Sequence, residues 1–488
     1  MVVNSLSFLL FFIAVFMVYF APGIRQSATR QNVWLLLTSY FFYCFVDWKM
    51  LPILFGVTVV FYWLGAQIKK EMDANNRKKA SRYMKSGVII GIGLLLYFKY
   101  LNFFAESIAE LLRMIGFNVS WSTLNIILPV GVSFFTFKLI SYLVEIKRKK
   151  TVPAENLLEF ATYISFFPTI MSGPIDRPNT FLPQLRKNHV FDYNLAMDGC
   201  QQVLWGIFTK MVIADNIALA TMNSWGETVN DGAYLFCGAI LSPIQVYADF
   251  DGYSNMAIGV GKLLGFKITR NFDHPLLARN VAEYWNRWHI SLTTWITDYV
   301  FTPLSLKLRD YAKIGIMLAI TANLVIIGLW HGANWTYAVF GVYHSLLFIP
   351  LILFGSFGKN KKLKEGKWGL PQMKDLCMMI VTYLLISFGH IIFFAPDLSF
   401  AGQHLLEIFN LPWNLISLVS GHILLSVILS IVVVITEWKY RNKEYVIQRP
   451  LQQYSGKVSK IMILDLLLCL LISLFGYNAQ TNFVYFQF

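Results

Sequence analysis

Long apolar segments that are almost free of charge recur along this 488-residue chain, and they constrain its fold more than any other feature. A helix needs about 20 mainly apolar residues to cross a bilayer. The clearest predicted spans cover residues 5–21, 33–46, 51–67, 87–104, 127–144, 314–330, 334–355, 376–395, 414–436 and 461–477. With further apolar stretches near residues 160–171, 201–222, 233–248 and 253–266, they predict an all-α, polytopic integral membrane protein with roughly 10–12 spans.

The composition excludes a water-soluble protein. Charged residues make up 14% of the chain, whereas an ordinary soluble domain carries roughly 25%. The net charge of +14 would suggest nucleic-acid binding in a soluble protein. Here, however, the basic residues cluster between apolar segments, as they do in the cytoplasmic loops of membrane proteins. We therefore expect membrane lipid around the chain and no nucleic-acid partner.

Four basic segments predict the topology. They cover residues 69–85, 147–150, 359–367 and 439–460. Placing all of them in the cytoplasm satisfies the positive-inside rule and puts both ends of the chain outside. We therefore predict a multi-pass protein of the inner (cytoplasmic) membrane with an extracytoplasmic C-terminus. The five cysteines are scattered and form no CxxC pair, so neither a disulfide framework nor a thiolate metal site is expected.

The segment 165–185, SFFPTIMSGPIDRPNTFLPQL, interrupts the helical pattern with four prolines and a glycine. Non-helical backbone is tolerated at membrane depth only where protein buries it or where it lines a wet cavity. The segment is therefore either a surface loop that dips to the headgroups or a re-entrant segment that walls a chamber.

Two of the eight histidines have unusual surroundings. His331 directly follows an apolar run, and His289 lies among three tryptophans in AEYWNRWHISLTTW. An ionisable group within a membrane is costly and is therefore a candidate functional group. Neutral imidazole can accept a proton from a hydroxyl as a general base. The alternatives are an interfacial aromatic belt at His331 and an exposed amphipathic helix at His289.

Two carboxylates lie in an apolar context, in YADFDGYSNMAIGVG. Asp249 and Asp251 could pair with nearby arginines or orient an imidazole. The glycines in this stretch do not follow a strand, so a nucleotide-binding loop is a weak interpretation. We expect Gly259 and Gly261 to allow close packing between helices instead.

Five motifs in a fixed order are similar to those of a known family. They are LPVGVSFFTFKLISYLVE (128–145), FFPTIMSGPIDRP (166–178), DFDGYSNMAIGVGKLLGF (249–266), NFDHPLLARNVAEYWNRWHISLTTW (271–295) and LWHGANW (329–335). Together they resemble the membrane-bound O-acyltransferase (MBOAT) family. The nearest branch looks like alginate O-acetyltransferase membrane proteins, which are related to proteins of peptidoglycan and cellulose acetylation and of teichoic-acid D-alanyl transfer.

The resemblance implies a fold and a reaction. The implied fold is one domain over residues 1–488, a ring of tilted helices around a central tunnel with re-entrant segments. The implied donor is acetyl-CoA or another acyl thioester on the cytoplasmic side, and no metal is implied. Residue by residue, the family's invariant histidine matches His331 and its second histidine matches His289. The reaction would serve O-acetylation of an extracytoplasmic polysaccharide, with an SGNH/GDSL-like acetyltransferase and a polysaccharide synthesis complex as partners.

The last six residues, FVYFQF (483–488), resemble the aromatic tail of this branch, in which a tyrosine is a proposed acyl relay. That role maps to Tyr485. Moving a proton from a phenol to an imidazole costs roughly 5 kcal/mol, less than from an aliphatic alcohol. Alternatively, the tail is a hydrophobic plug or a strand that docks a partner.

The resemblance has one visible departure, because Ala395 stands where we would expect an arginine in this branch. Three other functions remain open at this point. They are transfer of D-alanyl or another acyl group to a cell-wall polymer, solute transport, and a scaffold role without chemistry. Many spans, a broken segment and buried ionisable groups also occur in transporters.

Overall fold

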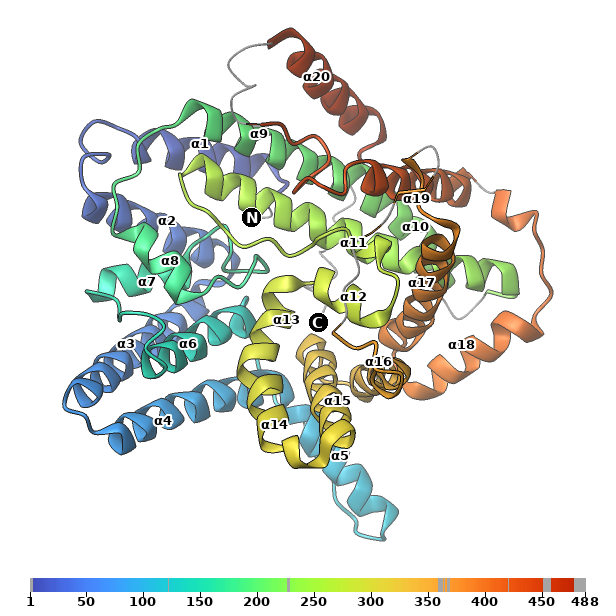
Figure 1. Cartoon of the computed structure of the whole chain (residues 1–488), viewed down its shortest axis with the longest axis horizontal. Coiled ribbons are helices and arrows are strands. Elements are labelled where there is room, and N and C mark those ends of the chain that lie inside the picture. Colours follow the sequence, from blue (N-terminus) through green and yellow to red (C-terminus); the bar gives the residue numbers. More distant parts are fainter. Residues whose placement is uncertain are drawn as a thin grey trace. The chain divides into compact units, whose positions relative to one another are not determined.

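The computed structural model describes residues 3–477 apart from positions 122, 226–228, 359–362, 364, 367–368, 420 and 451–457. Every regular element within this described part is helical, which confirms the predicted all-α class (Figure 1). The chain divides into two compact units, residues 1–200 with 257–269 and residues 201–256 with 270–488. The expected single domain over residues 1–488 stays a prediction.

The first unit contains eight complete helices. They are α1 (Leu6–Tyr19), α2 (Ala28–Asp47), α3 (Leu51–Asp73), α4 (Arg77–Leu95), α5 (Leu101–Met114), α6 (Val132–Lys147), α7 (Leu157–Ser165) and α8 (Pro178–Leu185). Two further helices, α9 (Tyr193–Phe208) and α11 (Gly232–Leu263), run from one unit into the other.

The second unit contains the remaining helices. They are α10 (Asp215–Ser224), α12 (Val281–Arg287), α13 (Ile290–Ile296), α14 (Thr302–Lys307), α15 (Ala312–His331), α16 (Trp335–Leu353), α17 (Met373–Phe394), α18 (Leu398–Asn410), α19 (Gly421–Lys439) and α20 (Val458–Phe475). Short π-helical turns cover Thr209–Ala214 between α9 and α10 and Thr297–Phe301 between α13 and α14.

Eight helical stretches in the described part are long and apolar enough to cross a membrane. They are Ala28–Asp73, Arg77–Met114, Tyr193–Met222, Gly232–Leu263, Arg309–His331, Trp335–Leu353, Met373–Phe394 and Gly421–Lys439. The 46-residue stretch Ala28–Asp73 contains α2 and α3, and therefore two of the predicted spans. The polytopic class is confirmed, whereas the number of spans stays a prediction.

The clearest difference from the sequence expectation is α11. The polar residues around Asp249 and Asp251 divide this region into two apolar stretches, yet the structure has one helix of 32 residues. Because α11 packs closely against α9 around these residues, this part of the helix does not need bulky apolar side chains. A Cβ atom on Gly206 of α9 would lie 2.6 Å from the carbonyl oxygen of Gly252, and one on Gly199 would lie 2.8 Å from that of Gly259. Helices α9 and α11 thus approach closely at Gly259, as expected, whereas a Cβ atom on Gly261 would lie 2.4 Å from the side chain of Ile268, which is not in a neighbouring helix.

The proline-rich segment is buried within its own unit. Residues 166–177 are not helical, yet side chains from Phe166 to Asp176 are all buried. The buried ammonium of Lys138 donates to Thr169 Oγ1 at 3.0 Å, and Asp176 Oδ1 accepts from the backbone N–H of Thr269 at 2.9 Å. The segment is therefore not a loop on the protein surface, which excludes that alternative, whereas its role as the wall of a chamber stays a prediction.

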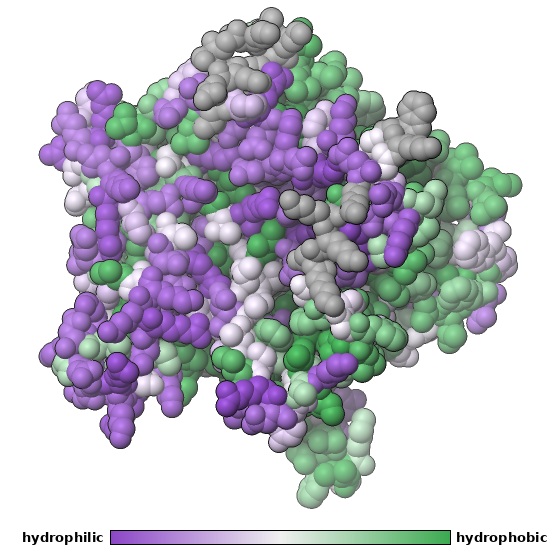
Figure 2. Space-filling view, viewed as in Figure 1, coloured by the Kyte–Doolittle hydropathy of each residue, from purple (hydrophilic) through white to green (hydrophobic). Residues whose placement is uncertain are grey.

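Large apolar side chains also lie on the outside of the helices. Figure 2 shows hydrophobic residues gathered over α18 and over the end of α5. Leu406 and Phe409 of α18 are 64% and 67% exposed, and Leu111 and Met114 of α5 are 60% and 75% exposed. Soluble proteins rarely expose such contiguous apolar surface, so lipid is the solvent that these faces fit.

Candidate active site

His331 is the last residue of α15, and the local sequence explains why the helix ends there. Gly332 adopts an extended conformation, and Asn334 caps α16 by accepting the backbone N–H of Thr336 at 3.0 Å. The resulting helical hairpin is tightly packed, because a Cβ atom on Gly328 would lie 2.0 Å from the carbonyl oxygen of Tyr337. The imidazole of His331 is thereby buried at 4% exposure.

His289 lies at a break between two short helices. The break sits between α12 and α13, where His289 adopts the left-handed conformation with φ of 44°. The backbone N–H of Ile290 donates to the carbonyl oxygen of Asn271 at 2.7 Å and fixes the turn. The imidazole is 1% exposed. The alternative of an exposed amphipathic helix is therefore wrong, because the chain breaks at His289 and turns the ring inward.

Both imidazoles pack against one indole, that of Trp330. The ring centroid of Trp330 lies 5.5 Å from that of His289 and 5.0 Å from that of His331, with near-perpendicular planes in both cases. Phe250 packs on His289 at 4.7 Å, and Phe393 packs on His331 at 5.0 Å. We call these five residues the histidine cluster. It brings together both histidines that the sequence singled out.

The surroundings keep His289 neutral. Burial lowers its pKa from 6.5 to about 3, because desolvation disfavours the charged form. A neutral imidazole retains a nitrogen lone pair and can accept a proton. His289 is therefore in the protonation state that a base or a hydrogen-bond acceptor requires at neutral pH.

A cavity of about 350 Å³ lies within the second unit, and neither histidine of the cluster is among the residues that line it. On α15 its wall is made of Ile320, Asn323, Leu324 and Ile327. These positions recur every three or four residues, so they share one face of the helix. His331 follows Ile327 by four residues and continues the same face. His331 therefore lies about one helical turn beyond the part of α15 that lines the cavity.

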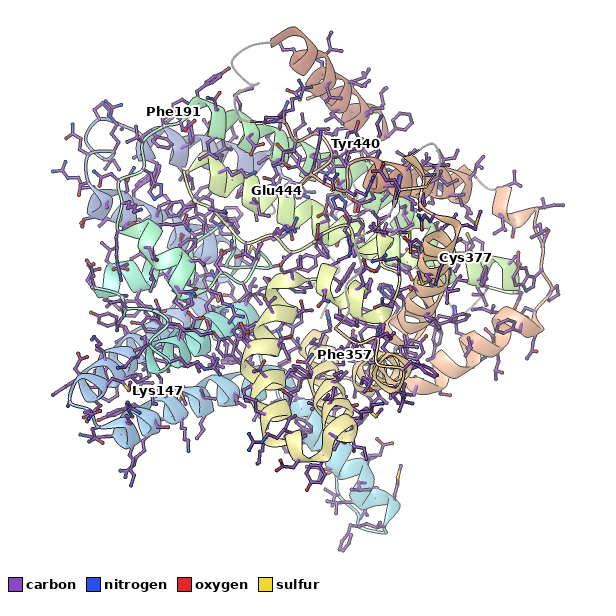
Figure 3. All side chains as sticks on the ribbon, viewed as in Figure 1. Lys147, Phe191, Phe357, Cys377, Tyr440 and Glu444 are labelled. Atoms are coloured by element: carbon purple, nitrogen blue, oxygen red, sulfur yellow. The ribbon has the colours of Figure 1, made fainter. Side chains whose placement is uncertain are left out.

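Two threonines of the cavity wall are related to His289 by the same spacing. Thr293 and Thr297 line the cavity, and they follow His289 at intervals of four residues. Thr293 Oγ1 also donates to the carbonyl oxygen of His289 at 3.2 Å. Phe357, labelled in Figure 3 in the segment after α16, lines the cavity with Gly358. Each of these two parts of the wall thus lies four residues along the chain from a histidine of the cluster.

Ion pairs hold α12 beside the cavity. Glu283 accepts from Arg279 at 3.0 Å and from Arg287 at 2.8 Å, and Arg279 also approaches Asp375 of α17 at 3.5 Å. Burial opposes the ionisation of Glu283, but the two guanidinium groups outweigh it and lower its pKa. These pairs anchor the helix that contributes Trp285 to the cavity wall.

The other sequence candidates have different positions. Asp249 pairs with the ammonium of Lys210 at 2.5 Å, so its partner is a lysine rather than the expected arginine. Asp251 accepts from the amide of Asn255 at 2.8 Å. Ala395 is buried directly after α17. Tyr485 and the tail 483–488 lie outside the described residues.

Four further buried histidines of this unit were not singled out from the sequence. They are His274, His344, His390 and His404, with exposures of 5%, 1%, 5% and 3%. Their sequence surroundings lack the neighbouring tryptophans that made His331 and His289 conspicuous. The available signal was their position in or next to apolar segments, where an ionisable residue is costly.

Comparison with known proteins identifies the family. The family model of the membrane-bound O-acyltransferases matches residues 147–388, a range that contains both histidines and the whole cavity. A probable alginate O-acetylase of Pseudomonas aeruginosa is 32% identical over 85% of this chain and 76% of its own length. The chain belongs to the membrane-bound O-acyltransferase family.

Other relatives of this MBOAT protein are named for the transfer of different groups. A peptidoglycan O-acetyltransferase of Helicobacter pylori is 28% identical over 82% of this chain and 78% of its own. A teichoic acid D-alanyltransferase of Bacillus subtilis is 30% identical over 55% of this chain and 69% of its own. The chain is thus a multi-pass membrane enzyme that transfers an acyl group, and such a reaction requires an acyl donor.

Proposed function

We propose that this MBOAT protein is a transmembrane O-acetyltransferase. It would take acetyl from a cytoplasmic thioester and pass it to a hydroxyl for O-acetylation of an extracytoplasmic polysaccharide. The observation that carries this proposal is the packing of His289 and His331 on one indole, that of Trp330, with each histidine four residues along the chain from a side chain that lines the cavity. The names of the alginate and peptidoglycan relatives support acetyl as the transferred group and a polysaccharide as the final acceptor.

The chemistry needs one base and returns its proton. His331 accepts the proton of the acceptor hydroxyl, whose oxygen attacks the thioester carbonyl carbon. The tetrahedral intermediate collapses, the carbon–sulfur bond breaks, and the thiolate takes the proton back from the imidazolium. An ester and a free thiol result, with no net gain or loss of protons. His289, held neutral, would donate or accept a hydrogen bond beside the reacting groups.

The cavity has features that suit the donor. Its walls carry the hydroxyls of Thr293, Thr294 and Thr297 and the amides of Asn286 and Asn323 among apolar side chains. Amides and hydroxyls can pair with the peptide-like groups of a thioester's linear arm. Phe357 and Gly358 of the wall directly precede the basic segment 359–367, which the charge pattern assigns to the cytoplasm. Acetyl-CoA or an acetylated carrier protein would enter there.

The acceptor side involves the C-terminal tail and a partner. Tyr485 would receive the acetyl group as a phenyl ester, a good leaving group, on the extracytoplasmic side of the inner membrane. An SGNH/GDSL-like acetyltransferase of a polysaccharide synthesis complex would then move the acetyl group to the polymer. The aromatic composition of residues 483–488 supports this relay.

The test of the proposed function is His331→Ala in cells that make the polysaccharide. We expect polymer acetylation to disappear while the amount of the protein in the membrane stays the same. His404→Leu is the matched control, because His404 of α18 is also buried, at 3% exposure, against an indole, that of Trp225. Normal acetylation in His331→Ala would refute the base role.

The relay has its own test. Tyr485→Phe removes only the hydroxyl, so we expect transfer to the polymer to stop while donor binding continues. Peptide mass spectrometry after incubation with labelled acetyl donor should find the label on Tyr485 in the parent protein. Acetylation of the polymer at the normal rate in Tyr485→Phe would contradict the relay.

A further inference from the structure

A buried histidine behind the cavity wall holds one of the wall's side chains. His344 of α16 is 1% exposed, and Trp285 of α12 is 7% exposed. The indole N–H of Trp285 donates to His344 Nδ1 at 3.3 Å. The two rings are nearly perpendicular, at 81°, with centroids 5.3 Å apart. Trp285 lines the cavity, whereas His344 lies in the layer behind it.

This hydrogen bond determines the protonation state of the imidazole. An indole nitrogen can only donate, so His344 Nδ1 must carry a lone pair. The proton of the neutral ring is therefore on Nε2. An imidazolium donates from both nitrogens and could not accept from Trp285. Only the neutral form with this tautomer keeps the indole in its observed place.

The packing leaves His344 little room to move. A Cβ atom on Gly389 of α17 would lie 2.8 Å from His344 Nε2, so the absence of a side chain there makes space for the ring. On the other side, Phe340 packs on His344 with ring centroids 4.4 Å apart. The acceptor nitrogen is thus held in a rigid environment.

Trp285 is also connected to the histidine cluster. Its ring contacts Phe340 at 6.5 Å between centroids, and Phe340 contacts Phe393 at 5.2 Å. Phe393 belongs to the cluster and packs directly on His331. If the indole of Trp285 rotated away from His344, both the cavity wall and the contact between Trp285 and Phe340 would change. Interiors packed this closely respond to displacements of a single group.

We propose that His344 is a positioning residue that fixes Trp285 as a wall of the donor cavity and thereby sets the affinity for the acyl thioester. The inference rests on the proposed function, because it takes the cavity as the donor site. His344 lies behind the wall, so it touches neither the donor nor the reacting atoms. Its loss should therefore weaken donor binding more than it slows the chemical step.

The experiment is a double-mutant cycle in the full-length protein. His344→Leu and Trp285→Phe each remove one side of the hydrogen bond. We expect each to raise KM for acetyl-CoA by roughly tenfold, the usual cost of leaving a buried polar group without its partner. The value of kcat should change by less than about twofold, because interactions shared by ground and transition states affect KM alone. The double variant should be no worse than either single variant, since one interaction is lost in all three.

A conservative replacement separates positioning from simple packing. The side-chain oxygen of asparagine can accept in place of Nδ1, so His344→Asn should recover most of the loss seen in His344→Leu. His404→Leu is again the control and should leave KM unchanged. Additive effects in the double variant, an unchanged KM in His344→Leu, or an equally poor His344→Asn would each overturn the inference.

A binding measurement distinguishes failure of this inference from failure of the proposed function. The same variants are titrated with a non-reactive thioether analogue of acetyl-CoA, which needs no turnover. Coupled losses of analogue binding support the positioning role even where the parent protein transfers no acetyl to a hydroxyl, an outcome that contradicts only the proposed reaction. Uncoupled binding overturns the positioning role even where transfer is normal.

Discussion

Two histidines of the second unit share an unusual backbone conformation but have different neighbouring groups. His274 and His289 both adopt the left-handed conformation, with φ of 52° and 44°. That conformation is uncommon for residues other than glycine, although histidine is enriched in it. Both side chains are buried, at 5% and 1% exposure. The comparison therefore isolates the effect of the neighbours on one side chain.

The neighbours of His274 are hydrogen-bond acceptors. Its Nδ1 lies 2.7 Å from a carboxylate oxygen of Glu437, and its Nε2 lies 3.0 Å from the carbonyl oxygen of Lys443. Tyr247 donates to the other carboxylate oxygen of Glu437 at 2.8 Å. Burial opposes the charge on His274, but the hydrogen bond and charge of Glu437 outweigh it and raise its pKa. Both nitrogens face acceptors, so the surroundings of His274 favour its charged form.

The neighbours of His289 are aromatic rings, those of Phe250 and Trp330. Burial there lowers its pKa to about 3. The same imidazole is thus a structural cation at one position and a neutral proton acceptor at the other. His274 ties α19 to the segment before α12, whereas His289 is the histidine for which we predict a chemical role.

The largest effect on stability should come from breaking the charged pair. His274→Asn keeps a residue that tolerates the left-handed backbone but leaves the Glu437 carboxylate buried without its cation. Loss of one partner of a buried ion pair costs roughly 3–5 kcal/mol. We expect a clear drop in the thermal unfolding temperature in detergent, with acetyl transfer per folded molecule unchanged. An unaltered unfolding temperature would show that the pair does not hold the fold.

The same substitution at the other site should have the opposite consequence. His289→Asn also keeps a residue that tolerates the left-handed backbone, and it removes the imidazole. We expect acetyl transfer to fall by roughly 100-fold, the lower end for losing an acid–base group, while the unfolding temperature stays close to that of the parent protein. Transfer assays with labelled acetyl-CoA and unfolding curves on one preparation provide the measurement. A stability loss without an activity loss would reverse our assignment of the two residues.

The smallest effect is on the pH dependence of stability. His274 has a raised pKa, so its contribution is complete below the unfolded value of about 6.5 and is lost as pH rises through the folded value. His289 has a lowered pKa, so stability is lost as pH falls from about 6.5 toward 3. Each effect is at most roughly 1.4 kcal/mol per pH unit. Unfolding temperatures across pH should show a smaller alkaline loss in His274→Asn and a smaller acid loss in His289→Asn; parallel curves for all three proteins would contradict both assignments.

Hydropathy predicts most of the helices from the sequence. It fails mainly at α11, which it divides although the structure has one continuous helix. Apolar runs identify helices such as α15 and α17 because their outer faces carry apolar side chains. Hydropathy divides α11 at Asp249 because it cannot show that Lys210, 39 positions earlier, neutralises this carboxylate by a pair at 2.5 Å. Partners distant in sequence decide whether a polar residue interrupts a span.

The candidate site was predictable where local sequence determines it. The glycine and asparagine after His331 end α15 and begin α16, and this break is visible in LWHGANW. The layer behind the cavity was not predictable. His344 and Trp285 lie 59 positions apart and meet only through the packing of α12 on α16. A residue that acts through a second side chain has no local motif.

The most direct test of the account is donor binding and acetyl transfer measured together in purified His331→Gln protein. We expect a non-reactive acetyl-CoA analogue to bind with the affinity of the parent protein, while transfer to a hydroxyl acceptor falls by at least roughly 100-fold. Transfer at the parent rate with the analogue still bound would show that His331 is not the base.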